Sequence, residues 1–158
     1  MNRSIWKYIL FIGVSLLFQV TVVQYIEILN WRPDLVLILL VMFSIQYGAV
    51  SGSTAGFFSG LLSDLLSGHL LGVGVLSKAI TGFIAGSMVS VFPDKSRFLI
   101  TLIICGFIHN LLYFFVTTLG SDFSWRLLIF VYTVPNLFYT ALVGLFINFL
   151  FGNWLKEE

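Results

Sequence analysis

The chain has 158 residues, of which 59% are hydrophobic and only 9% are charged, and its mean hydropathy is +1.03. A soluble domain usually carries about 25% charged residues, so this composition excludes that class. The net charge of +1 excludes a clustered basic surface for nucleic acid. The single cysteine, Cys105, excludes a disulfide framework and a cysteine zinc site. A membrane-spanning helix uses about 20 apolar residues, so we expect one all-α transmembrane domain of six helices over residues 1–158.

The six predicted spans follow one another with short connections. The first, residues 5–25, lacks a small-residue cleavage site and is interpreted as an uncleaved helix rather than a signal peptide. Residues 34–67 are too many for one upright span and few for two, so we predict short helices over 34–47 and 49–67, with a turn near Tyr47 and Gly48. The last three spans are expected over residues 73–92, 98–119 and 126–151, with a kink at Pro135 in the last.

The connections indicate how the chain is oriented. Pro33 and Asp34 are both favourable at a helix start and close the first connection. Six spans place both termini on one side, and basic residues of short connections favour the cytoplasm. The amino-terminal side has Arg3, Lys7, Lys95, Arg97 and Lys156, and the other side has Arg32 and Arg126. The tryptophans, which favour membrane interfaces, are Trp6, Trp31, Trp125 and Trp154, all near predicted span ends.

Small residues recur every four positions in the third and fourth predicted spans. Positions four apart share a helix face, and small residues there let two backbones approach closely. The alternative is that glycine is simply common in membrane helices. We call these two rows the glycine ladders; their glycines are Gly52, Gly56, Gly60, Gly74, Gly82 and Gly86.

Each ladder contains one charged residue, Asp64 in the first and Lys78 in the second. Both lie roughly 10 Å below the expected apex of the hairpin, at 1.5 Å of rise per residue. Opposite charges at matching depth predict an intramembrane ion pair between Asp64 and Lys78. The alternative is a proton or ion relay through Asp64, which would need further linked ionisable groups.

A second polar group is predicted near the membrane midplane, formed by His109, Asn110 and Asn136. Such residues commonly act as hydrogen-bond partners between membrane helices, and the alternative is a ligand site. No sequence motif for catalysis and no metal-ligand spacing is present, so neither an enzyme nor a metal or other cofactor is expected.

The stretch from Arg32 to Gly72 resembles the MreD family of rod-shape-determining proteins. It contains Arg-Pro-Asp at residues 32–34 and Asp-Leu-Leu-Ser-Gly-His-Leu-Leu-Gly at residues 64–72. Length, number of spans and the polar loop after the fifth span fit as well. The resemblance implies a six-helix fold similar to the substrate-binding (S) components of energy-coupling-factor transporters. The motif positions it carries over are Pro33, Asp34, Asp64, Ser67, Gly68 and Gly72.

The resemblance also implies a function and partners. The implied function is that of a non-enzymatic scaffold in the bacterial inner membrane, which supports peptidoglycan synthesis and cell shape. The implied partners are MreC, RodA and a penicillin-binding transpeptidase. Contact with MreB would be indirect or run through the tails and residues 93–97. The outward loops, residues 27–34, 68–72 and 120–125, would help position the outer part of the partner.

The rival hypothesis is a small-molecule (vitamin-like) binding subunit of a transporter. It requires an outward-opening cavity lined by groups such as Asp34, His109, Asn110 and Asn136. An interior filled by phenylalanine side chains would argue against it.

Overall fold

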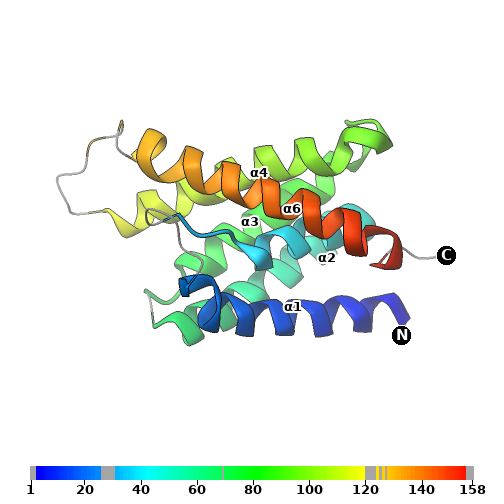
Figure 1. The fold of residues 1–158 in the computed structure, drawn as a ribbon, viewed down its shortest axis with the longest axis horizontal. Coiled ribbons are helices and arrows are strands. Elements are labelled where there is room, and N and C mark those ends of the chain that lie inside the picture. The colour runs from blue at the N-terminus through cyan, green and yellow to red at the C-terminus, as the bar shows by residue number, and fades with distance from the viewer. Residues whose placement is uncertain are drawn as a thin grey trace.

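The computed structural model of the chain describes residues 3–25, 31–68, 70–119, 124, 126 and 128–155, and these residues form an all-helical bundle (Figure 1). Four helical stretches, residues 35–67, 73–90, 96–117 and 129–152, are long and apolar enough to cross a membrane, and residues 5–21 form a shorter apolar helix. The helices are α1 (Arg3–Thr21), α2 (Leu35–Ser67), α3 (Val73–Ser87), α4 (Asp94–Thr117) and α6 (Val134–Leu155), and the shorter turns are η1 (Val23–Tyr25), η2 (Met88–Ser90) and η3 (Leu128–Thr133).

The expected number of six helices is corrected to five within these described residues. The predicted spans 34–47 and 49–67 are joined in one 33-residue element, α2, because helical structure resumes directly after a single non-helical residue. That residue is Gly48, with φ 86° and ψ 179°, at the position where the turn between the two spans was predicted. This region of backbone space is essentially restricted to glycine.

Gly48 folds α2 back on itself. We call residues 35–47 the first arm and residues 49–67 the second arm. Asp34 and Asp64 line the same pocket, whereas a straight helix would separate them by about 45 Å. A Cβ atom on Gly52 would likewise lie 2.7 Å from the Cβ of Ser44, which belongs to the first arm. The two arms therefore reverse the chain without a loop.

The first arm is the central element of the hydrophobic core. All residues from Val36 to Met42 are buried, with relative exposures between 0% and 7%. Side chains from α1, α3, α4 and α6 surround it, and the buried core is Tyr8, Ile38, Leu39, Val41, Met42, Ala85, Leu102, Cys105 and Leu155. A helix that is apolar all round is stable only when other helices or lipid cover every face. This arrangement places the start of the arm, at Asp34, among the other helices.

The two glycine ladders face each other, one on the second arm and one on α3. A Cβ atom on Gly60 would lie 2.5 Å from the carbonyl oxygen of Gly74, and one on Gly52 would lie 2.5 Å from that of Gly82. Gly56 packs in the same way against the backbone of Lys78. The helices are thus in backbone contact, which only residues without a side chain permit.

The two ends of the bundle differ. The start of α1, the end of α6 and the connection from α3 to α4 lie at one end, and the turn from α2 to α3 lies at the other (Figure 1). Pro135 is the second residue of α6, which begins directly after the π-helical turn η3, and the missing N–H of a proline is tolerated in the first turn of a helix. Expectations for residues 26–30, His69, residues 120–123, Trp125 and Lys156 lie outside the described residues.

Candidate functional site

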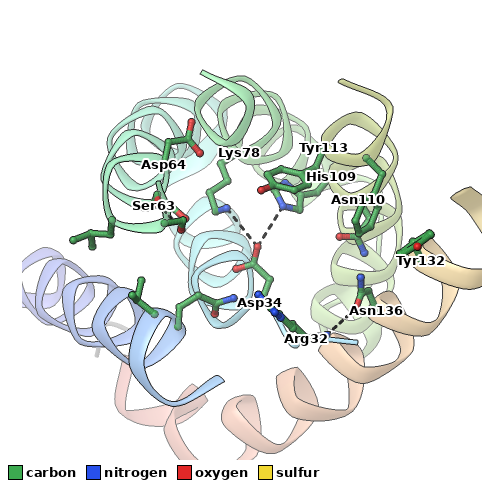
Figure 2. A pocket seen from close by; sticks show the side chains of 15 residues that line it. Arg32, Asp34, Ser63, Asp64, Lys78, His109, Asn110, Tyr113, Tyr132 and Asn136 are labelled. Atoms are coloured by element: carbon green, nitrogen blue, oxygen red, sulfur yellow. Dashed lines mark hydrogen bonds and ion pairs between the residues drawn. The ribbon is translucent and has the colours of Figure 1, made fainter. Parts of the chain in front are cut away.

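The carboxylate of Asp34 is the centre of a polar cluster inside the bundle. Its Oδ2 atom lies 3.4 Å from Nζ of Lys78 and 3.3 Å from Nε2 of His109 (Figure 2). Its Oδ1 atom accepts a 2.9 Å hydrogen bond from the backbone N–H of Leu37, so the same side chain caps α2. Three helices therefore meet at one carboxylate.

Lys78 is almost completely buried, with an exposure of 4%. A buried ammonium group is costly unless a nearby anion compensates it. The predicted ion pair of Lys78 with Asp64 is corrected here, because the structure pairs Lys78 with Asp34. The reason is the fold-back at Gly48, which brings the start of the first arm to α3. We call Asp34, Lys78 and His109 the charged triad.

Asp64 has a different role in the structure, at the turn between α2 and α3. Its carboxylate accepts hydrogen bonds from the backbone N–H groups of Gly72 (2.9 Å), Gly74 (3.1 Å) and Val75 (3.3 Å). These are N–H groups at the start of α3, which have no partner within the helix. A carboxylate is also favourable at the positive end of the helix dipole. Asp64 therefore links the end of α2 to the beginning of α3 by hydrogen bonds.

The other motif residues of this turn shape its backbone. Gly68 ends α2 in the left-handed conformation (φ 65°), and Gly72 precedes α3 with φ 104°. Ser67 donates a 2.7 Å hydrogen bond to the carbonyl oxygen of Ser63. Left-handed glycine is a common way to end a helix. Residues 64–72 therefore form the turn between α2 and α3, which Asp64 stabilises through its hydrogen bonds to the start of α3.

Two residues that the sequence analysis did not identify hold the segment before α2. Gln19 of α1 donates to the carbonyl oxygen of Pro33 (3.2 Å) and accepts from the N–H of Leu35 (3.0 Å). Thr140 of α6 accepts a hydrogen bond from the N–H of Asp34 (3.2 Å). Only their polarity within apolar helices could have drawn attention to them.

The predicted midplane residues lie together around the same space. His109 belongs to the charged triad, and the side chains of Asn110 and Asn136 extend from α4 and α6 on one side of it (Figure 2). The Oδ1 atom of Asn136 accepts a 2.8 Å hydrogen bond from the N–H of Arg32. The ring of Tyr113 stacks on that of His109, with centroids 6.1 Å apart.

These residues line an open pocket of about 470 Å³. It extends from exposed residues, such as Arg32 and Ser67, past the partly exposed Asp34 to the buried side chains of Lys78 and His109. We call it the polar pocket; its lining is Gln19, Val20, Arg32, Asp34, Ser63, Asp64, Leu66, Ser67, Lys78, His109, Asn110, Tyr113, Phe114, Tyr132 and Asn136. Among the described residues, no group of three or more histidine, cysteine, aspartate or glutamate side chains is placed to hold a metal ion.

The fold and this interior site define an all-α, multi-pass membrane protein with a polar pocket between its helices. Comparison with protein families identifies it further. The family model for "rod shape-determining protein MreD" matches residues 3–157, so the chain belongs to the MreD family. The family consists of non-enzymatic, shape-determining membrane proteins, and membership is consistent with the bacterial inner membrane. Comparisons with curated proteins and with solved structures found no match.

Proposed function

We propose that this protein is a scaffold subunit of the rod complex that binds a single-span partner, MreC, through its membrane helices. The observation that carries the proposal is the family match, which extends over residues 3–157. Because a rod-shape-determining protein has no reaction to perform, its contribution must come from the contacts that it makes. RodA, a penicillin-binding transpeptidase and, indirectly, MreB are the further partners that the family resemblance implies.

The surface of the bundle supports this proposal. Only 17% of the apolar stretch of α6 is buried inside the chain, against 56% for α2. Large apolar side chains such as Leu17 on α1 and Phe146 on α6 are exposed. In a membrane such a surface is covered by lipid or by another helix, and close packing between helices supplies the affinity.

The bundle is expected to have both termini in the cytoplasm and the polar pocket at the outer surface. The excess of basic residues on the amino-terminal side supports this orientation. The single transmembrane domain would then present the turn from α2 to α3 to the outer part of the partner. A fold related to the S components of energy-coupling-factor transporters is compatible with the reversal at Gly48.

Photo-crosslinking in living cells tests the scaffold proposal. A photoreactive residue at Leu17 or Phe146 is expected to capture a single-span protein and wall-synthesis enzymes, identified by mass. The control is the same residue at Leu102, which is 0% exposed and should capture only this chain. Capture of an ATP-binding transporter module at Leu17 or Phe146, without a single-span partner, would contradict the scaffold proposal.

One observation favours the second candidate, a small-molecule binding subunit of a transporter. That function requires a cavity lined by Asp34, His109, Asn110 and Asn136, and all four residues line the polar pocket. The crosslinking experiment separates the two candidates, because each predicts a different captured partner.

A further inference from the structure

The polar pocket differs from most ligand pockets in the chemistry of its walls. Pockets for small molecules are usually about 300–1,000 Å³ and are lined mainly by apolar side chains. This one has a suitable volume of about 470 Å³, but only Val20, Leu66 and Phe114 of its fifteen lining residues are apolar. Its occupant is therefore expected to carry more polar groups than a typical pocket ligand, next to some apolar surface.

The charges of the lining are already compensated by protein groups. Lys78 and His109 both contact Asp34, and Asp64 accepts hydrogen bonds from three backbone N–H groups. The two acidic residues are matched in number by Lys78 and Arg32. An anion such as a phosphate is bound best by cations that are not already paired, so this lining favours a ligand without net charge.

Neutral hydrogen-bonding groups remain available in the pocket. Asn110 is only 9% exposed, yet its amide makes no hydrogen bond with the part of the chain that the structure describes. The same holds for the hydroxyl groups of Ser63 and Tyr113 and for Nδ2 of Asn136. Ser63 and Asn110 lie on opposite sides of the pocket (Figure 2). Amide and hydroxyl groups together offer donors and acceptors from both sides.

We infer that the polar pocket binds a neutral, polyhydroxylated ring, that is, a monosaccharide unit. Each hydroxyl group of a sugar donates and accepts a hydrogen bond, which matches the amides and hydroxyls that line both sides. The sugar could be free or could be the headgroup of a glycolipid, since the pocket lies at the end of a membrane-embedded bundle.

The test uses the full chain, purified in an amine-oxide detergent so that no detergent sugar competes. The probes are methyl glycosides of glucose, galactose, mannose and N-acetylglucosamine, and octyl glucoside below its micelle concentration. Binding is measured by the shift in Tm and by titration calorimetry. At least one neutral probe is expected to bind and to raise Tm, because a ligand of the folded state stabilises it.

Two variants tie this binding to the pocket. Asn110→Leu is expected to weaken the affinity by about tenfold or more, since it removes the unused buried amide. Ser63→Leu on the opposite side should have a similar effect and serves as the second test if Asn110→Leu does not fold. The matched control, Asn148→Leu, changes an asparagine of α6 outside the pocket and should leave binding unchanged.

The outcomes are distinct. Binding of the methyl glycosides assigns a free sugar, and binding of octyl glucoside alone assigns a glycolipid headgroup. The inference is overturned if no neutral probe binds, if the charged sugar glucuronate binds more tightly, or if neither pocket variant weakens binding. Since the measurement uses only the purified chain, its failure leaves the crosslinking result and the scaffold proposal unaffected.

Discussion

Among single residues, Asp34 connects more parts of the bundle than its position at a helix start suggests. Its carboxylate contacts Lys78 of α3 and His109 of α4, and it caps α2 through Leu37. Its backbone N–H contacts Thr140 of α6. Such a network stabilises a membrane bundle to the extent that its members have partners, because lipid cannot supply them. Nδ1 of His109 has no hydrogen-bond partner among the described residues, so the triad is satisfied through Nε2 of that ring.

Loss of one charge from this network should be more harmful than loss of both. Lys78→Met leaves Asp34 without its cation and is expected to lower the free energy of unfolding by about 3 kcal/mol. The double variant Asp34→Asn with Lys78→Met should recover part of that loss. Reversible unfolding in mixed micelles gives both values.

The control for this experiment is Lys7→Met. Lys7 lies near the surface, donates to the carbonyl oxygen of Trp154 and lies 4.4 Å from the centroid of its ring. A contact of this kind is worth about 1 kcal/mol or less. A double variant no more stable than Lys78→Met alone would show that the charged triad is not a coupled unit.

At the scale of elements, α2 changes direction at a single residue. Gly48 and Gly68 both have positive φ and no neighbouring atom within 4 Å of an added Cβ, but their conformations differ. Gly68 is left-handed helical (φ 65°, ψ 15°), which asparagine tolerates, whereas Gly48 (φ 86°, ψ 179°) lies in a region essentially restricted to glycine.

The same substitution should therefore have two different effects. Gly48→Asn is expected to lower the free energy of unfolding by about 2 kcal/mol, through backbone strain alone. Gly68→Asn should change it by less than about 1 kcal/mol. Denaturant titration of the two variants compares them, and equal losses would mean that Gly48 is not the strained point of α2.

The ladder contact between the second arm and α3 depends on the absence of side chains. A Cβ atom at Gly56 would lie 2.7 Å from the carbonyl carbon of Lys78, so Gly56→Ala must push the two backbones apart. We expect a loss of about 3 kcal/mol in unfolding free energy. The matched control is Gly13→Ala on α1. No atom of another element lies within 4 Å of a Cβ added there, so alanine should be neutral or stabilising. Equal changes in the unfolding free energy of the two variants would contradict the backbone contact between the glycine ladders.

On the scale of the whole molecule, the two ends of the bundle should face opposite sides of the membrane. A cysteine introduced at Ser124 is expected to react with an impermeant maleimide added to intact cells. A cysteine at Asp94, in the connection from α3 to α4, should react only after permeabilisation. The native Cys105 is buried and should not react in either case, which provides the background. Labelling of Asp94→Cys alone in intact cells would reverse the proposed orientation.

Much of the fold could be predicted from local features of the sequence. The lengths of the apolar stretches predict the membrane helices. The four-residue spacing of the glycines predicts which faces of α2 and α3 meet. The break at Gly48 was predicted because residues 34–67 could not form one upright span. The joining of both arms in one element could not be predicted, since it depends on how few residues the reversal needs.

The sequence by itself determined that this chain is a multi-pass membrane protein of the MreD family, because composition and local motifs do not depend on distant contacts. Only the tertiary structure decided which carboxylate neutralises Lys78. Asp64 is nearer to Lys78 along the chain and was the natural choice by depth, but its oxygens are occupied by the N–H groups that begin α3. The fold-back at Gly48 instead brings Asp34 to Lys78 from 44 residues away in the sequence (78 − 34). A partner at that distance is set by how the helices pack, and helical periodicity carries no information about it.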